Sequence, residues 1–320
     1  MGEDSKSGRS EGSLAVQGPV LLTGALGQLG LALQELCPTE LQLHAFSRSQ
    51  LDIADSDSVE TAFSRTKPAL VINAAAYAAV DRAESEPEAA YRANALGPQV
   101  LAERCAANGT RLIHVSTDFV FDGSASRPYR ADAATAPLSV YGLSKLQGEE
   151  AVAAGLEDHV ILRTGWVYSH RGSNFFRTML RLHAERAQLT VVADQVGTPT
   201  RAESLARAIW AIACRPALRG IYHWSDAGVC SWYDFAVAIG RQAAKKGLVE
   251  QAAEVIPINS EDYPTPASRP HYSVLDKNRT WDELAMSSHH WQEELAQAIG
   301  RALADQNSSN EQGRTAEEHG

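Results

Sequence analysis

The chain has 320 residues, of which 44% are hydrophobic, and it carries a formal net charge of −10. A chain of this length and composition is expected to fold as one large domain, or as one domain with a smaller lobe. The negative charge argues against nucleic acid or an anionic membrane as a partner, because phosphate would be repelled, and no apolar run approaches the roughly 20 residues of a membrane span.

The two ends of the chain are polar. Residues 1–18 are rich in Gly and Ser and lack the apolar core of a signal peptide, so we expect a disordered leader there, and a disordered tail over residues 305–320. The four cysteines show no metal-ligand spacing and are expected to be reduced thiols. These features predict a cytoplasmic protein.

The first predicted unit is a strand, a glycine turn and a helix in immediate succession. The strand covers residues 19–23, and the helical pattern covers residues 31–36. Gly24 permits the tight turn, Gly27 lets a pyrophosphate approach the backbone, and Gly30 lets the helix lie close to the sheet. A phosphate at this point would meet the free N–H groups of a helix N-terminus. The unit therefore predicts a dinucleotide-binding turn, with a purely structural glycine turn as the alternative.

The second predicted strand covers residues 41–46 and ends in Ser47 and Arg48. An acidic residue at this place would bind the ribose 2′-hydroxyl of NAD, whereas Arg48 favours the 2′-phosphate of NADPH. NADH as the cofactor, with Arg48 in solvent, is the alternative. The helix that begins over residues 51–58 is expected to be capped by Asp55.

The third predicted strand covers residues 69–76, a continuous apolar run that is typical of a parallel sheet covered on both faces. Its alanines would leave room for a flat cofactor. The predicted helix over residues 87–108 carries Asn94, which is a candidate for bonding to the backbone near the site. A surface or capping role for Asn94 is the alternative.

The strongest catalytic pattern is a strand that ends at Ser116, Thr117 and Asp118, followed by a helix with Tyr141 and Lys145. Two residues four positions apart share one face of a helix. At ~5 Å and an effective dielectric constant of ~20, attraction between phenolate and ammonium is roughly 3 kcal/mol, which would lower a tyrosine pKa by about two units. Tyr141 would then be a proton donor, with Thr117 beside the reacting oxygen. The alternative is a chance pair on an ordinary helix.

A strand over residues 159–164 completes an alternation of strands and helices. This alternation predicts an α/β fold with a doubly wound (Rossmann) parallel sheet, and the candidate residues lie at its carboxyl edge. We expect an NAD(P)-binding domain over residues 19–165, to which some later segments return, and a mainly substrate-binding lobe over residues 166–304. Further elements are expected at residues 174–185, 201–213, 220–224 and 231–244, with an extended proline-rich segment at 263–270.

Together these motifs resemble the extended short-chain dehydrogenases/reductases and, more narrowly, the dTDP-4-dehydrorhamnose reductase family over roughly residues 19–300. The strings that carry the resemblance are AVDRAESEPE, STDFVFDG, APLSVYGLSK, TGWVY, DQVGTPT and YPTPASRP. The resemblance implies NADPH-dependent reduction of the 4-keto group of dTDP-4-dehydro-L-rhamnose to dTDP-L-rhamnose. It also implies that Tyr141 is the proton donor, that Lys145 lowers its pKa and holds the nicotinamide ribose, and that Thr117 bonds to the sugar carbonyl or to the tyrosine.

The resemblance implies further binding positions. Those for the cofactor are Gly27, Gln28 and Leu29 at the pyrophosphate, Asp52 and Ile53 at the adenine, and Ala76, Tyr77 and Ala78 along the cofactor. Those for the substrate are Thr117, Asp118, Trp166 and, at the diphosphate, Arg269. Trp166 as a core aromatic and Arg269 as a loop brace are the alternatives, and Tyr77 departs from the histidine expected at its position.

A dTDP-sugar is therefore the expected partner, without nucleic acid or membrane. Some relatives bind Mg²⁺ through glutamates at a dimer contact, but no local carboxylate cluster predicts a metal here, so Mg²⁺ and a homodimer stay open. Two other functions also stay open: an NADP-binding regulatory subunit similar to that of methionine adenosyltransferase, and a related nucleotide-sugar epimerase or dehydratase.

Overall fold

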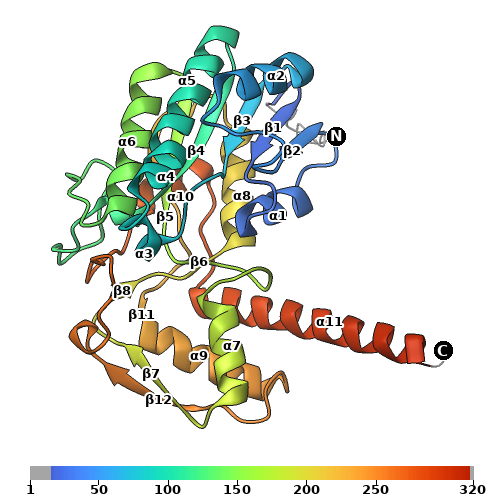
Figure 1. Cartoon of the computed structure of the whole chain (residues 1–320), viewed down its shortest axis with the longest axis vertical. Coiled ribbons are helices and arrows are strands. Elements are labelled where there is room, and N and C mark those ends of the chain that lie inside the picture. The colour runs from blue at the N-terminus through green and yellow to red at the C-terminus, as the bar shows by residue number, and fades with distance from the viewer. Residues whose placement is uncertain (1–15, 318–320) are drawn as a thin grey trace, which may run out of the picture.

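A six-stranded parallel sheet organises the larger of two lobes in the computed structural model, which describes residues 16–317, with side chains over residues 16–308 (Figure 1). Its strands are β1 (Val20–Thr23), β2 (Leu43–Phe46), β3 (Leu70–Asn73), β4 (Arg111–Thr117), β5 (His159–Thr164) and β10 (Gly220–His223). They lie in the order β10-β5-β4-β3-β1-β2. The order reverses between β1 and β3, and ligands of such sheets bind outside the carboxyl ends of the strands at this point.

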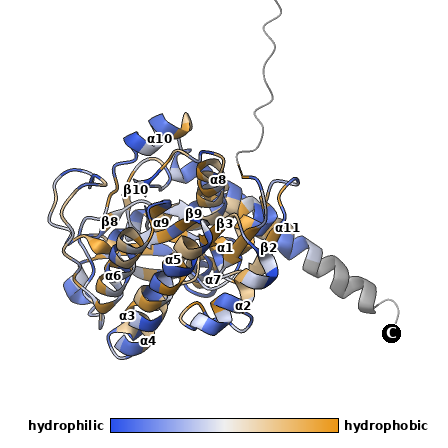
Figure 2. Cartoon of the chain, turned by 90° about the horizontal axis from the view of Figure 1, so that it is seen from above, coloured by the Kyte–Doolittle hydropathy of each residue, from blue (hydrophilic) through white to orange (hydrophobic). Residues whose placement is uncertain are grey.

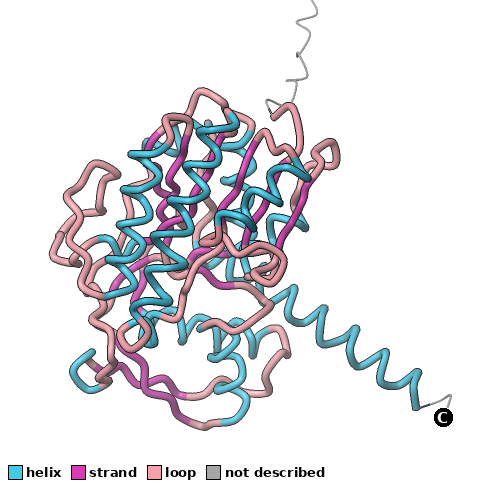
Figure 3. Tube along the Cα trace, turned by 45° about the horizontal axis from the view of Figure 1, so that its top comes forward, coloured by secondary structure: helices cyan, strands magenta, loops and turns pink. Residues whose placement is uncertain are grey.

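Helices cover both faces of the sheet (Figure 3). The helices of the larger lobe are α1 (Gln28–Glu35), α2 (Ser56–Thr66), α3 (Val80–Ala83), α4 (Pro87–Tyr91), α5 (Gly97–Asn108), α6 (Val140–Gly155), α8 (Ala202–Ala213) and α10 (Asn278–Leu284). Leu22 packs with α1 and α8, whereas Leu21 packs on the opposite face with α2, α5 and α6. Successive side chains of a strand point to opposite faces, so each strand supplies both cores.

The smaller lobe combines short strand pairs with three helices. Its elements are β6 (Val167–Tyr168), α7 (Phe175–Glu185), β7 (Gln188–Val192), β8 (Val196–Gly197), β9 (Thr200–Arg201), β11 (Cys230–Ser231), α9 (Trp232–Lys245), β12 (Glu254–Ile258) and α11 (Trp291–Glu317), with a 3₁₀ turn at Ser260–Asp262. β7 pairs with β12 and β6 with β9 in parallel, and β8 pairs with β11 antiparallel. A separate core made largely by α7, α9 and α11 holds this lobe together.

Most predicted elements are present, with two differences. The strand at Gly220–His223 and the helix α8 are later segments that belong to the larger lobe, where β10 pairs with β5 and α8 packs on α1. The first difference is that β3 ends at Asn73, so the three alanines that follow lie in a loop. Residues 305–317 continue α11 away from the body of the molecule (Figure 1). A disordered tail was expected here, but polar residues without proline can extend a helix that packing has already nucleated.

Hydrophobic residues gather around the strands, and hydrophilic residues lie on the outer helices and loops (Figure 2). Among the helices over residues 16–317, none combines the length and the apolar character that crossing a bilayer requires. The predicted leader falls almost wholly on residues 1–15, outside the described part of the chain.

Candidate active site

Two adjoining cavities lie at the carboxyl edge of the sheet. The first, the glycine-loop cavity, has a volume of about 430 Å³ and lies between the turn after β1, the end of β2 and α4. The second, the tyrosine cavity, has a volume of about 680 Å³ and lies between the end of β4, α6 and the smaller lobe. Leu26, Gly27, Ala74, Ala76 and Ala78 border both cavities. Every residue that the sequence predicted for the site lines one of them, except Gly30.

The glycine turn has the geometry of an anion-binding loop. Gly24 has a φ of +72°, and a Cβ there would lie 2.7 Å from the Ala74 backbone. At Gly30 a Cβ would lie 2.1 Å from the Gly24 carbonyl oxygen, so Gly30 permits close packing and lines no cavity. Gly27 caps α1 without any side-chain acceptor, which leaves the first N–H groups of that helix available to a phosphate.

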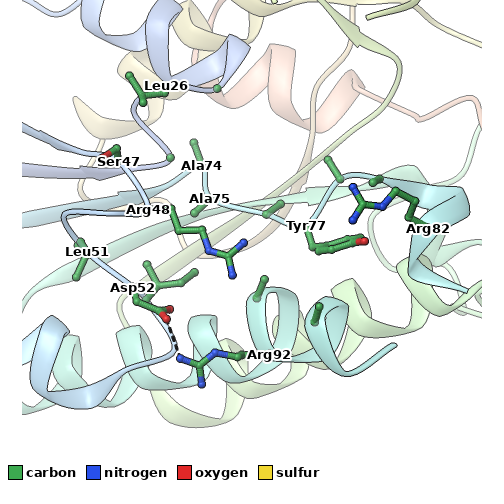
Figure 4. A pocket seen from close by; sticks show the side chains of 18 residues that line it. Leu26, Ser47, Arg48, Leu51, Asp52, Ala74, Ala75, Tyr77, Arg82 and Arg92 are labelled. Atoms are coloured by element: carbon green, nitrogen blue, oxygen red, sulfur yellow. Dashed lines mark hydrogen bonds and ion pairs between the residues drawn. The ribbon is translucent and has the colours of Figure 1, made fainter. Parts of the chain in front are cut away.

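Arginines surround the glycine-loop cavity, as Figure 4 shows. Arg92 donates to Asp52 (2.7 Å); although partial burial would raise the pKa of Asp52, this bond helps to hold it below its usual value. Arg82 pairs with Glu86. Arg48 extends into the cavity (Figure 4), and no hydrogen bond or close ion pair of its guanidinium is found within residues 16–308. Arg48 is therefore a cation available to an anionic ligand.

Asn94 fixes the loop that borders both cavities. It is fully buried in a π-helical turn, Arg92–Leu96, between α4 and α5. Its side chain accepts from the Tyr77 N–H (2.8 Å) and donates to the Tyr77 carbonyl (3.1 Å) and to Ser144 (3.0 Å). Of the two roles considered for Asn94, the structure has backbone bonding, and it ties the loop to α6. A π turn of this kind is rare and is found mostly at functional sites.

Tyr141 and Thr117 meet inside the tyrosine cavity. Ser139 caps α6 through the Gly142 N–H (3.2 Å), which places Tyr141 in the first turn. The phenol is enclosed by protein, and this burial raises the pKa of Tyr141 to about 12, although a hydrogen bond with Thr117 acts in the opposite direction. The Thr117 hydroxyl also donates to Asp118 (3.1 Å). Tyr141 is consequently protonated throughout the neutral range.

Lys145 is buried beside Tyr141, and its Nζ donates to the Val115 carbonyl (2.7 Å). Burial lowers the pKa of Lys145 to about 8, and the charge of Glu149 opposes that change. In the structure, burial of the phenol raises the pKa of Tyr141 above its usual value, a cost that the prediction from charge attraction left out. Stabilisation of the phenolate by Lys145 stays a prediction.

Asp118 adjoins the Tyr141–Thr117 pair through its hydrogen bond with Thr117. It is buried, and burial raises its pKa to about 6. Gly165 packs directly against it, since a Cβ at Gly165 would lie 2.5 Å from an Asp118 carboxylate oxygen. Asp118 lines the cavity as predicted, and its tight packing restrains Thr117.

Trp166 stacks on Trp232, with ring centroids 3.5 Å apart and planes 4° from parallel. Trp166 has a φ of +50°, and a Cβ at Gly197 would come within 2.6 Å of its ring. Both rings line the tyrosine cavity. The pair forms an aromatic wall, which is a surface suited to the apolar face of a sugar. Trp232, from α9, was not identified from the sequence.

Arg269 lines the tyrosine cavity from the proline-rich segment. Its two terminal nitrogens bond to Asp81 at 3.0 and 2.7 Å, and one also bonds to Thr265 (2.6 Å). Arg269 thus braces the segment against α3. Its predicted contact with a diphosphate stays a prediction.

The metal-binding side chains of the described part of the chain do not form a cluster. Within residues 16–308, no group of three or more His, Cys, Asp or Glu side chains is placed to hold a metal ion. Cys37, Cys105, Cys214 and Cys230 are free thiols.

This geometry has clear counterparts among known proteins. The family model described as RmlD substrate binding domain matches residues 18–304. The chain belongs to the RmlD, or dTDP-4-dehydrorhamnose reductase, family. This finding confirms the family that the sequence motifs predicted.

Individual members agree over nearly their full length. The spore coat polysaccharide biosynthesis protein SpsK of Bacillus subtilis is 40% identical over 281 residues, covering 88% of this chain and 96% of SpsK. A dTDP-4-dehydrorhamnose reductase of Sinorhizobium fredii is 39% identical over 290 residues, covering 89% of this chain and 97% of the relative. The crystal structure of a Bacillus anthracis dTDP-4-dehydrorhamnose reductase in complex with NADP is 36% identical, with a TM-score of 0.84, covering 89% of this chain and 99% of that one. The doubly wound fold predicted from the sequence is thereby confirmed.

Proposed function

We propose that this member of the RmlD family reduces the 4-keto group of dTDP-4-dehydro-L-rhamnose to give dTDP-L-rhamnose, with NADPH as the reductant. The observation that carries the proposal is the meeting of Tyr141, Lys145 and Thr117 in a cavity that adjoins the glycine-loop cavity. Relatives named as dTDP-4-dehydrorhamnose reductases, one of them solved with NADP, support the same substrate and cofactor.

The residues present fit a dinucleotide with a 2′-phosphate. The uncapped N-terminus of α1 can accept the pyrophosphate. Arg48 offers a positive charge that no hydrogen bond or close ion pair within residues 16–308 engages, although it acts through space on Asp52. Asp52 and Ile53 border the place for the adenine, and the loop at Ala76, which Asn94 holds through Tyr77, lines both cavities. NADPH, when bound, supplies the hydride for the carbonyl carbon.

The protein then manages the proton and the charge. Tyr141 gives its proton to the oxygen that becomes the alcohol, and the Thr117 hydroxyl, turned away from Asp118, donates a hydrogen bond to the same developing charge. Lys145 stabilises the phenolate that is left behind. The Trp166–Trp232 wall positions the sugar, so that its carbonyl faces Tyr141.

The direct test is a spectrophotometric assay of NADPH and NADH oxidation with the dTDP-4-keto sugar, with the product identified by NMR. We expect consumption of NADPH in a 1:1 ratio to dTDP-L-rhamnose, and slower consumption of NADH. Absence of net NADPH oxidation would reject the proposal in favour of an NADP-binding subunit or an epimerase that retains its NAD.

A further inference from the structure

A buried ionic cluster adjoins the catalytic residues, and of its members only Ser116 borders the tyrosine cavity. Its members are Glu149 of α6, Arg163 of β5 and Ser116 of β4, all shielded from solvent. Arg163 donates to both Glu149 carboxylate oxygens, from Nη2 at 2.6 Å and from Nε at 2.9 and 3.1 Å. Ser116 donates to the same carboxylate at 2.5 Å. Burying such charges costs free energy, and a buried ion pair often adds little to the stability of the fold. Its presence here therefore points to a role in function.

The cluster connects directly to the reaction machinery. Glu149 lies one helical turn beyond Lys145 on α6, and Ser116 directly precedes Thr117 on β4. Lys145 bonds to the carbonyl of Val115 while Glu149 bonds to the hydroxyl of Ser116. Two consecutive residues of β4 are therefore fastened to α6 immediately before the threonine that contacts Tyr141.

The charges around Lys145 single out Glu149. Tyr141 on the same helix is neutral at ordinary pH. His114 on β4 is neutral as well, because burial holds its pKa well below the usual value. The charge of Asp118 acts on the Tyr141 phenol and is not among the charges that shift the pKa of Lys145. Glu149 is the one carboxylate, within residues 16–308, whose charge supports a protonated Lys145, against the lowering of its pKa to about 8 by burial.

We propose that Glu149 is a positioning residue for the reaction: it is the counter-ion that keeps Lys145 charged, and through Ser116 it fixes the strand end that carries Thr117. Arg163 holds the Glu149 carboxylate in place for both tasks. The link to turnover rests on the proposed reduction, whereas the effect on Lys145 does not.

The test compares two variants that break the same ion pair from opposite sides. Glu149→Gln removes the negative charge near Lys145 but keeps a group that can accept from Ser116. Arg163→Gln removes a positive charge and leaves Glu149 in place. Both should lower stability, because each leaves a buried partner uncompensated. A purely structural ion pair would thus give the two variants the same phenotype.

The readout is the titration of the Lys145 side chain, followed by NMR in protein labelled with carbon-13 at the lysine ε-carbons. The chain has six lysines, and Lys145→Arg assigns the signal. We expect the Lys145 midpoint to fall by about one pH unit or more in Glu149→Gln, and not to fall in Arg163→Gln. Lys277 is an internal control, since burial also lowers its pKa to about 8 but its charged neighbours are Asp226 and Asp276. Its midpoint should stay unchanged in both variants.

A Lys145 midpoint that is unchanged in Glu149→Gln, or that falls equally in the two variants, would overturn the proposal. If either single variant does not fold, the double variant Glu149→Gln/Arg163→Gln removes both charges together, a change that is often tolerated; its Lys145 midpoint should fall, and an unchanged midpoint contradicts the proposal. The alkaline limb of kcat should shift with the NMR midpoint. The Lys145 titration needs neither substrate nor cofactor. If the protein does not catalyse the proposed reduction, the titration still shows whether Glu149 keeps Lys145 charged, so the two failures can be told apart.

Discussion

At Tyr141, burial and hydrogen bonding act on the phenol in opposite directions. Burial raises its pKa to about 12, and the hydrogen bond with Thr117 opposes that rise. A phenol with so high a pKa keeps its proton until a stronger base, such as an alkoxide forming in the cavity, is there to take it. The phenolate that results is left beside Lys145, which is why the charge state of that lysine matters.

Tyr141→Phe tests this role. We expect kcat to fall by roughly 10² to 10⁴, because the proton donor is lost while the cavity keeps its shape. The dissociation constant for NADPH, measured by fluorescence titration, should be nearly unchanged. Tyr129→Phe is the matched control: it removes a buried phenol that bonds to Asp122, outside both cavities, and should leave kcat unaffected. Equal kcat values for Tyr141→Phe and the wild type would remove Tyr141 from the mechanism.

Arg48 should decide the choice between the two nicotinamide cofactors. Arg48→Ala removes the arginine of the glycine-loop cavity that makes no hydrogen bond or close ion pair within residues 16–308. The Kd for NADPH should rise by about tenfold or more, because a charge-assisted hydrogen bond contributes roughly 1.5–3 kcal/mol. The Kd for NADH should change little. Calorimetry with each cofactor measures both values. The control is Arg130→Ala, an exposed arginine paired with Asp132. Equal losses for NADPH and NADH would contradict a 2′-phosphate contact.

At the scale of elements, the order and type of most strands and helices of the larger lobe were predictable. β5 matches its predicted range, and β1, β2 and α8 differ by one or two residues. Continuous apolar runs and glycine turns are local features of the sequence, and they predict the strands and turns of a buried parallel sheet without knowledge of tertiary contacts. The short strand pairs of the smaller lobe were not predicted, because pairs such as β6 with β9 are two residues long and depend on contacts across the fold.

The site was predictable where it rests on local motifs and not where it rests on tertiary contacts. Tyr141 and Lys145 share a helix, and Thr117 ends a strand, so their spacing carries the information. Trp232 follows Ser231 at the start of an ordinary helix, and only the fold brings it onto Trp166. Glu149 could have been noticed four residues beyond Lys145, but nothing in the sequence signals its pairing with Arg163.

The close packing of α1 on the glycine turn gives a prediction for this element. Gly30→Ala would place a methyl group 2.1 Å from the Gly24 carbonyl oxygen, so the turn must shift. We expect a loss of about 1–3 kcal/mol in the free energy of unfolding, together with weaker NADPH binding. Gly155→Ala is the control, since its Cβ would meet Ala102 at 3.6 Å, an ordinary contact. Chemical denaturation distinguishes them, and equal stabilities of the two variants would show that the turn is not constrained as described.

At the scale of the molecule, the tyrosine cavity lies between the lobes, and each lobe supplies part of its wall. Tyr141 and Lys145 come from α6 of the larger lobe, whereas Trp232 and Phe235 come from α9 of the smaller. Trp232→Ala should therefore raise KM for the dTDP-sugar several-fold, because part of the aromatic wall is lost, without changing the Kd for NADPH. Steady-state kinetics and a cofactor titration separate the two effects. An increase in the Kd for NADPH as large as that in KM would mean that the wall serves the cofactor instead.

Buried lysines also make the stability of the whole molecule depend on pH. Burial lowers the pKa of Lys277 from 10.5 to about 8, so between these values the folded chain binds fewer protons at this site than the unfolded chain. Stability from this site must then rise with pH across that window, by roughly 3 kcal/mol in total. Denaturation of the wild type and of Lys277→Met at pH 7.5 and 10.5 isolates the contribution, because other groups titrate equally in both. Relative to Lys277→Met, the wild type should have a higher free energy of unfolding at pH 10.5 than at pH 7.5. The same difference at both pH values would contradict the burial of a titrating Lys277.

The most direct test of the proposed reduction follows the hydrogen that is transferred from NADPH to the sugar. NADPH deuterated at the transferred position of nicotinamide C4 is mixed with the protein and dTDP-4-dehydro-L-rhamnose, and the product is examined by NMR and mass spectrometry. We predict one deuterium at C4 of the sugar with the wild type, and formation of that product slowed at least about 100-fold in Tyr141→Phe. Oxidation of the cofactor without deuterium at C4 of the sugar would contradict the proposed hydride transfer. An undiminished rate in Tyr141→Phe would contradict Tyr141 as the proton donor.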